Sequence, residues 1–131
     1  MVINSLGPRH FISMITVREL YAIRAILNKA ILKAREDDAE QIIKLHLAIG
    51  EIAEFDQNAI QRQWRDLSKG TLAEGAQLHF RVIPAEVQCM SCFQKYHPQN
   101  GRIFCSTCGS MGAKILSGEE FYLESIELEH A

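Results

Sequence analysis

The sequence Cys89-Met90-Ser91-Cys92, followed after twelve residues by Cys105-Ser106-Thr107-Cys108, decides how this chain folds. These two Cys-x-x-Cys pairs contain all four cysteines of the 131 residues. Each pair can form a tight turn that directs two sulfur atoms at one centre, and a connection of this length lets both turns close around one ion. The spacing therefore predicts a tetrahedral site with four thiolate ligands, in which Zn²⁺ is the expected occupant.

Three other uses of the four cysteines stay open. Two structural disulfides are typical of secreted mini-proteins, but we expect no secretion signal here, and the chain is long enough to form a core without cross-links. A thioredoxin-like redox site requires a Cys-x-x-Cys motif that opens a helix after a strand, and neither pair has that context. An iron–sulfur cluster would use the same four thiolates as zinc.

A site filled by four thiolates has no open coordination position, so we expect a structural metal and not a catalytic one. The loop of residues 93–104 has too few apolar side chains to fold unaided, and metal binding would supply the missing free energy. His97 lies in this loop. Because the four sulfurs already fill the site, we predict that the His97 side chain is exposed.

The composition indicates one ordinary globular domain with a small additional module. Hydrophobic residues make up 47% of the chain and charged residues 23%, and the formal net charge is −2. No block of like charge suggests a nucleic-acid arm or a membrane-surface helix, and no apolar run approaches the roughly eighteen residues that cross a bilayer. We therefore expect a soluble protein without membrane association, and cysteines reserved for metal indicate the reducing cytoplasm.

Two segments have the periodicity of amphipathic helices. From Val17 to Arg35, apolar residues recur at spacings of three and four, which places them on one helical face. A second helix is predicted to start near Asp56, whose carboxylate can accept from the first N–H groups of the helix, and to stop at Lys69-Gly70. Trp64 lies at a buried position of this second pattern and is predicted to anchor the core.

Alternating apolar and polar residues predict the strands. The first spans residues 43–49 and the second residues 78–82, where His79 would face away from the apolar side. After the cysteines we expect a short strand at 114–116 and another at 121–128, with a bulge near Glu124-Ser125 where the apolar phase changes. The positions predicted to be buried are Ile43, Leu45, Leu47, Ile49, Leu78, Phe80 and Val82.

The order helix, strand, helix, strand, ribbon, strand predicts an α+β fold. Two helices would pack on a three-stranded sheet, and a four-cysteine zinc ribbon would be inserted between two of the strands. We assign residues 88–117 to the zinc-ribbon domain and residues 17–87 together with 118–131 to the α/β domain. Residues 1–16 show no sustained period, so we predict a flexible N-terminal extension, and Met14 offers an alternative start to Met1.

Several segments together match the pattern of a known family: Leu47-Ala48-Ile49-Gly50-Glu51, Thr71-Leu72-Ala73-Glu74-Gly75-Ala76-Gln77-Leu78, the two cysteine pairs with Gly109-Ser110, and Ser125-Ile126-Glu127. Over residues 17–129 the chain resembles the HypA/HybF nickel-insertion proteins, metallochaperones for NiFe hydrogenase and sometimes urease. The resemblance implies structural zinc in the ribbon, a nickel-type α/β domain and no enzymatic activity. It also implies partners from nickel-enzyme maturation, a GTPase accessory protein and the hydrogenase large subunit, with either a monomer or a homodimer.

The resemblance further implies a nickel site at the N-terminus, formed in the family by the free amine, a His in second position and usually a Glu in third. Here that Met-His-Glu-Leu run aligns with Val17-Arg18-Glu19-Leu20. Arg18 cannot coordinate Ni²⁺ because its guanidinium stays protonated. Glu19 remains, and Asp56 lies where some members have an acid, so these two carboxylates are the candidates for a residual nickel site. Their simpler interpretation is a first-turn carboxylate at Glu19 and a helix N-cap at Asp56.

Three functions are therefore compared. The first is a HypA-like accessory protein in nickel insertion, and the second is a divergent paralogue that has lost nickel binding and acts as a zinc-ribbon interaction module. The third is a nucleic-acid zinc ribbon, but Lys95, Arg102 and Lys114 are the only charged side chains from Cys89 to Lys114. With the formal −2 of a four-thiolate zinc centre, they leave a poor surface for phosphates. No motif indicates an enzyme.

Overall fold

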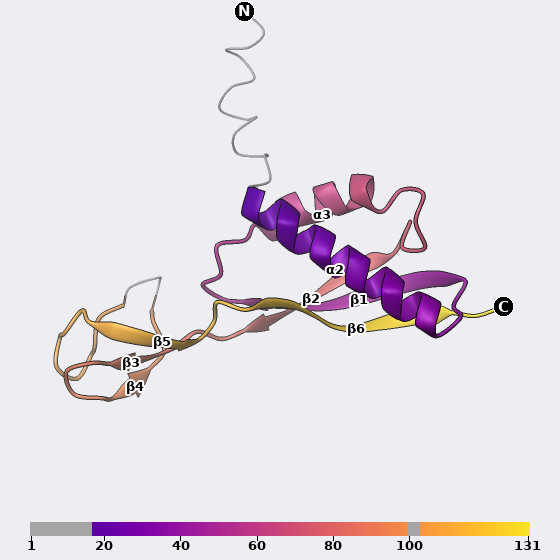
Figure 1. Cartoon of the computed structure of the whole chain (residues 1–131). Helices are drawn as coiled ribbons and strands as arrows, with labels where there is room; N and C mark the ends of the chain where they lie inside the picture. Colours follow the sequence, from indigo (N-terminus) through magenta and orange to yellow (C-terminus); the bar gives the residue numbers. More distant parts are fainter. Residues whose placement is uncertain (1–16, 100–102) are drawn as a thin grey trace, which may run out of the picture. The chain divides into compact units, whose positions relative to one another are not determined.

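The computed structural model describes residues 17–99 and 103–131. The extension predicted at residues 1–16, including Met14, lies outside the described residues. In chain order the elements are α2 (Val17–Glu36), β1 (Gln41–Gly50), α3 (Gln57–Leu67), β2 (Gln77–Ile83), β3 (Glu86–Cys89), β4 (Lys95–Tyr96), β5 (Ala113–Ser117) and β6 (Phe121–Glu129) (Figure 1). Neither described helix contains a stretch apolar enough to span a bilayer.

The chain divides into two compact units. The first contains residues 17–45, Phe55–Leu78 and Ile126–Ala131, and therefore both helices. The second contains His46–Glu54 and His79–Ser125, and therefore all four cysteines.

Helix α2 forms where the apolar period predicted it, and its buried face lies in the first unit. The buried side chains include Ile23, Leu27, Ala30 and Ala34, which are spaced three or four residues apart. The helix ends at Glu36, and Asp38 then takes a positive φ of 54°. Helix α2 contacts helix α3, so the apolar stripe is covered from within the same unit.

Helix α3 begins at the predicted N-cap. The Asp56 carboxylate accepts from the amides of Asn58 and Ala59 at 2.9 and 3.3 Å, which satisfies two N–H groups of the first turn. Trp64 is buried, and its indole Nε1 donates to the carbonyl of Ala76 at 3.1 Å. The prediction of a tryptophan anchor is therefore confirmed.

The first sheet has the strand order β2-β1-β6. Backbone hydrogen bonds link the start of β1 to the loop that leads into β2, and the residue after β1 to the end of β2. These two strands therefore run parallel, with α3 as the crossover between them. Strand β6 runs antiparallel to β1, because the start of each lies beside the end of the other. The bonds are Ile42 N to Leu72 O, Glu51 N to Ile83 O, Glu40 N to Glu129 O, and Gly50 N to Glu120 O.

The predicted burial of Ile43 and Val82 is wrong. Ile42 and Leu45 are fully buried while Ile43 is 43% exposed, a spacing of three that strict alternation cannot give, so the phase of β1 changes there. Val82 is 51% exposed. It lies in the second unit, whose described residues contain no helix to cover this strand. In β6 the predicted change of phase is confirmed by two successive exposed residues, Glu124 and Ser125.

The second sheet has the order β4-β3-β5 and lies entirely in the second unit. Both neighbours run antiparallel to β3, and the fully buried Val87 faces Tyr96 on one side and Ile115 on the other. This ribbon sheet is inserted between β2 and β6 of the first sheet. Two helices, a three-stranded sheet and an inserted four-cysteine ribbon confirm the predicted α+β class.

Candidate metal centre

The four cysteines converge on one point. Their sulfur atoms all lie within 4.8 Å of one another, with 3.5 Å between Cys89 and Cys108 and 3.6 Å between Cys92 and Cys105. Four sulfurs bound to zinc at about 2.3 Å in a tetrahedron are roughly 3.8 Å apart, so the arrangement fits that ion. All four thiols are free, and a disulfide would need about 2.05 Å between sulfurs.

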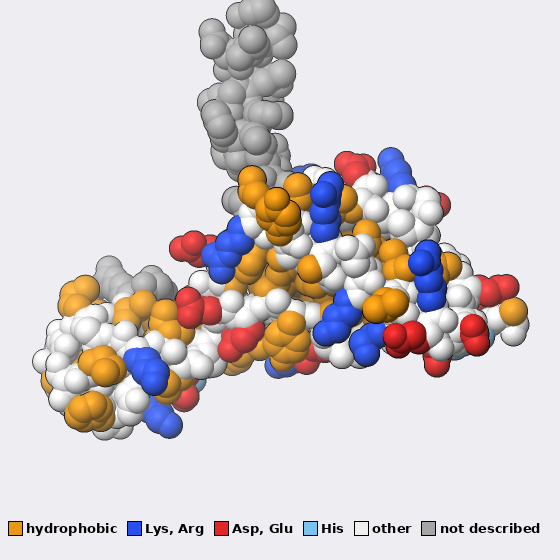
Figure 2. Space-filling model, in the orientation of Figure 1, with side chains coloured by type: hydrophobic (Ala, Val, Ile, Leu, Met, Phe, Trp, Pro, Cys, Tyr) orange, Lys and Arg blue, Asp and Glu red, His pale blue; other side chains and the backbone are white. Residues whose placement is uncertain are grey.

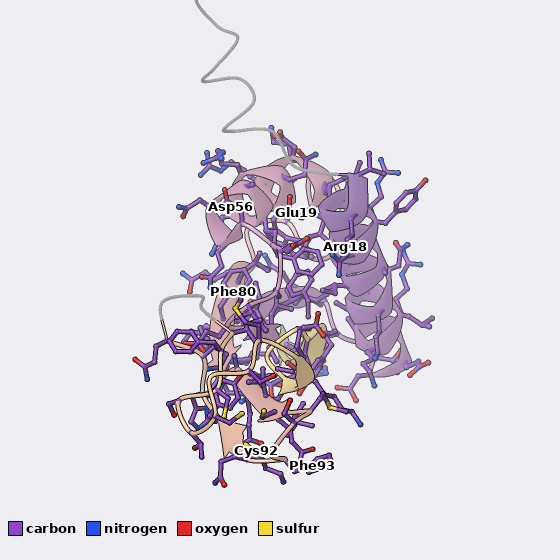
Figure 3. The ribbon with its side chains drawn as sticks, turned by 90° about the vertical axis from the view of Figure 1, so that its left-hand side faces the viewer. Arg18, Glu19, Asp56, Phe80, Cys92 and Phe93 are labelled. Carbon is purple, nitrogen blue, oxygen red and sulfur yellow. The ribbon has the colours of Figure 1, made fainter. Side chains whose placement is uncertain are left out.

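The two Cys-x-x-Cys turns have the same backbone geometry. In the first, the amide of Phe93 donates to the carbonyl of Cys89 at 2.9 Å, and Phe93 has a φ of 63°. In the second, the amide of Gly109 donates to the carbonyl of Cys105 at 2.7 Å, and Gly109 has a φ of 76°. Each turn therefore reverses the chain just after its second cysteine and keeps both sulfurs on one side. Cys92 and Phe93 are marked in Figure 3.

Backbone amides in these turns lower the pKa of the first thiol of each pair. The amide of Cys92 donates to Cys89 Sγ at 3.5 Å and is the main cause that lowers the pKa of Cys89 to about 6. The amide of Cys108 lowers the pKa of Cys105 in the same way. These two thiols are the buried ones, so the amides stabilise charge where water does not reach it.

The second thiol of each pair has the opposite shift. The amides of Gln94 and Ser110 act to lower the pKa of Cys92 and Cys108, but neighbouring sulfurs and the loss of water outweigh them. The pKa of Cys92 rises to about 12, and that of Cys108 is also raised. Without a metal, the thiols of Cys92 and Cys108 therefore stay protonated at neutral pH.

Zinc uptake near neutral pH is expected to release the protons of Cys92 and Cys108, because zinc binds thiolates and these thiols have raised pKa values. Lowering the pH should weaken zinc binding, and more steeply once Cys89 also takes up a proton below a pH of about 6. Calorimetric zinc titrations in buffers of different ionisation enthalpy measure this release. A binding enthalpy that is the same in every buffer would contradict it.

Two side chains next to the cysteines have defined positions. His97 is exposed, as predicted, with its Nδ1 2.7 Å from the carbonyl oxygen of Ala85. The hydroxyl of Tyr96 is buried and has no hydrogen-bond partner among the described residues. Loss of water and then the four cysteine charges raise the pKa of Tyr96, so the phenol stays neutral beside the sulfurs. No local pattern distinguishes Tyr96 from the other aromatic side chains between the two cysteine pairs.

Glu19 and Asp56, the candidates for a residual nickel site, are brought together by the fold (Figure 3). Glu19 lies in the first turn of α2 and is only 2% exposed. Its Oε2 accepts from the backbone amide of Asp56 at 2.5 Å. The Asp56 carboxylate accepts from the first turn of α3. Both carboxylates are thus engaged with backbone amides, and Glu19 joins the start of α2 to the start of α3.

Arg18 lies at the same end of α2. Its side chain is exposed, and its guanidinium carbon is 5.0 Å from the centre of the Phe55 ring, the distance of a cation–π contact. In residues 17–99 and 103–131, only the four cysteines form a group of three or more His, Cys, Asp or Glu residues close enough to share an ion. Glu19 and Asp56 belong to no such group in this part of the chain.

Comparison with known proteins settles the family. A family model described as "Hydrogenase/urease nickel incorporation, metallochaperone, hypA" matches residues 17–128. The chain belongs to the HypA family. The hydrogenase maturation factor HypA of Dehalococcoides mccartyi is 33% identical over 113 residues, which cover 86% of this chain and 95% of that protein. HypA of Caldanaerobacter subterraneus is 29% identical over 114 residues, which cover 86% and 100%.

Solved structures of HypA proteins have the same fold. The solution structure of the Ni metallochaperone HypA from Helicobacter pylori has a TM-score of 0.61 and 20% identity, covering 86% of this chain and 98% of that one. A second structure, titled "Solution structure of HypA protein", has a TM-score of 0.64 and 21% identity. The family resemblance read from the sequence motifs is therefore confirmed.

Proposed function

We propose that this chain is a HypA-type accessory protein that serves nickel insertion during NiFe hydrogenase maturation and catalyses no reaction itself. The match over residues 17–128, combined with the four converging sulfurs, is the observation that carries the proposal. Its partners would be the GTPase accessory protein and the hydrogenase large subunit, in the cytoplasm, where thiols stay reduced. On the face seen in Figure 2, Lys and Arg side chains are interspersed with acidic and hydrophobic ones, which favours protein partners over nucleic acid.

Cys89, Cys92, Cys105 and Cys108 would hold one structural zinc ion. The sulfur spacing supports this role, and four ligands leave no position open for a substrate. Residues 88–117 would act as the zinc-ribbon domain, because this range holds all four cysteines, strands β4 and β5, and the end of β3. Residues 17–87 and 118–131 would form the nickel-type domain.

Nickel binding at the start of α2 is expected to be weak. Arg18 offers no lone pair, and Glu19 and Asp56 already accept backbone N–H groups. Nickel prefers imidazole and amine nitrogen to isolated carboxylates. The cation at residue 18, held over Phe55, therefore favours a second candidate function: a paralogue that has lost nickel at this site and acts as a zinc-ribbon interaction module.

Restoring the family's ligands should create nickel binding at this end of α2. The test variant starts at residue 17 and carries Val17→Met and Arg18→His, which gives a free amine followed by an imidazole and Glu19. The matched control has the same start and Val17→Met but keeps Arg18. Nickel that binds elsewhere on the chain is then the same in both variants and drops out of the comparison. Calorimetry should show one additional Ni²⁺ per chain in the test variant only. Equal nickel binding by the two variants would contradict the proposed location.

The two functions are separated in cells that lack their own HypA protein. An accessory protein for nickel insertion should restore hydrogenase activity when the full chain is supplied, and tagged protein should capture the GTPase or the large subunit. A paralogue without nickel would restore no activity, whatever partner it binds. Loss of both activity and capture would rule out the HypA-type function.

A further inference from the structure

Two histidines lie side by side outside the cysteine site, on neighbouring strands of the first sheet. His46 is on β1 and His79 is on β2, and their ring centres are 5.3 Å apart with the planes at 66°. We propose that His46 and His79 form a second metal site, which binds one borderline divalent transition-metal ion such as Ni²⁺ through two imidazole nitrogens.

The strands place both imidazoles on one face of the sheet. Leu45 and Leu47 on either side of His46 are buried, and so is Leu78 next to His79. Because successive side chains of a strand point to opposite faces, both rings lie on the face opposite these leucines. His79 is exposed and His46 is partly exposed, so a hydrated ion can approach the pair from solvent.

The separation of the rings suits one shared ion. A metal bound to an imidazole nitrogen at about 2.0–2.1 Å lies about 3.2 Å from the ring centre. Two such rings are then roughly 4.5 Å apart at an octahedral angle and roughly 5.2 Å apart at a tetrahedral angle. The observed distance between the ring centres, 5.3 Å, is close to the tetrahedral value. Water would fill the remaining positions, and imidazole is a ligand that nickel, copper and zinc all accept.

Two cations, Lys44 and Arg81, each lie two residues from one of the histidines, and each is paired with a carboxylate. Lys44 Nζ lies 3.9 Å from Glu127 Oε2. Arg81, two residues after His79, is paired with Glu124 of β6 through Nη2 to Oε2 at 2.8 Å and Nε to Oε1 at 3.0 Å. This pair cancels its own charge next to the site. The Arg81 hydrogen bonds are the main cause that lowers the pKa of Glu124, with a smaller lowering from His46, so the carboxylate is ionised and within electrostatic reach of that imidazole.

The choice of nickel as probe rests on the proposed function. Arg18 offers nickel no nitrogen lone pair where an imidazole would, and His46 with His79 would supply two nitrogen donors in another part of the chain. Two imidazoles and water hold an ion less tightly than a closed site, which suits a cargo that must be passed on.

The test is calorimetric titration of the full, zinc-loaded chain with Ni²⁺, beside His46→Ala, His79→Ala and the control His130→Ala. His130 is an exposed histidine paired with Asp37. One Ni²⁺ per chain is expected for the unmodified protein and the control. Because losing even an outer-shell partner costs about 10–100-fold in affinity, each ligand variant should bind at least tenfold more weakly. Nickel should also broaden the imidazole NMR signals of His46 and His79 before those of His130.

Three results would overturn this site. The unmodified chain could bind no nickel, His46→Ala and His79→Ala could bind it as tightly as the unmodified chain, or absorption bands of thiolate-bound nickel could show that it binds only at the cysteines. Unchanged amide spectra of His79→Ala, whose side chain is exposed, show that the variant is folded. The proposed function is tested separately by hydrogenase recovery. Recovery without nickel at the histidines would contradict this inference alone, and nickel at the histidines without recovery would contradict the function alone.

Discussion

Replacing Cys89 by serine is expected to abolish stoichiometric zinc binding and to unfold strands β3, β4 and β5. Cys89 is fully buried, and its sulfur lies 3.5 Å from that of Cys108. Structural zinc in small modules contributes about 10–16 kcal/mol of apparent binding free energy near neutral pH, and this is the free energy that folds the module. Without it, the short β4 strand and its neighbours in residues 93–99 have little apolar burial to hold them.

Amide NMR spectra of the zinc-loaded protein and of Cys89→Ser check this expectation. Amides of Glu86–Ser117 should lose their dispersion, while those of helices α2 and α3, which belong to the other unit, should keep theirs. Ser106→Ala is the matched control, because Ser106 is an exposed residue inside the second cysteine turn. If the amide signals of Glu86–Ser117 stay dispersed in Cys89→Ser without zinc, the metal is not needed for the fold of this segment.

Gly50→Ala is expected to destabilise the protein by about 3 kcal/mol or more, the upper part of the range for overpacking. A Cβ at Gly50 would lie 1.9 Å from the carbonyl oxygen of Gly118 and 2.1 Å from its carbonyl carbon. These are backbone atoms, so no side-chain rotation relieves the clash. The chain at Gly118 is also fixed, because its carbonyl accepts from the amide of Ile52 at 2.9 Å.

Urea denaturation at a constant zinc concentration measures the effect of Gly50→Ala. Gly112→Ala is the control, since the nearest atom to an added Cβ there is Ser110 Oγ at 3.8 Å, an ordinary contact. The control should change the free energy of unfolding by less than about 1 kcal/mol. A similarly small change in Gly50→Ala would mean that this close approach is not required by the fold.

The Gly50 contact also explains part of the family motif in physical terms. In Leu47-Ala48-Ile49-Gly50-Glu51, the two neighbours of Ala48 are buried apolar side chains, and Gly50 allows the backbone of Gly118 to approach. The Glu51 carboxylate accepts from the amide of Ala85 at 2.8 Å. The motif thus fixes where the chain leaves β1 and meets two later segments.

The helices and the cysteine cluster could be predicted because their signals are local. An apolar period of three and four marks α2, a capping carboxylate at Asp56 marks the start of α3, and paired Cys-x-x-Cys spacing marks the sulfur site. The exposure of Ile43 and Val82 could not be predicted from the sequence. It depends on a change of phase in β1 and on which strands a helix covers.

The contacts between segments that are distant along the chain could not be predicted from the sequence either. Glu19 accepts from an amide 37 residues away, so its burial follows from how α2 meets α3 and not from its own first-turn position. His46 and His79 each look like an exposed strand residue when taken alone. They become a pair only through the parallel alignment of β1 with β2, which no local pattern predicts.

Intact mass spectrometry of the native protein, followed by the same measurement under denaturing conditions, tests the central claim most directly. We predict one zinc ion per native chain and, after denaturation, a mass with all four thiols reduced. A chain without metal whose mass is lower by one hydrogen for each cysteine would show two disulfides in place of the zinc site and would contradict it.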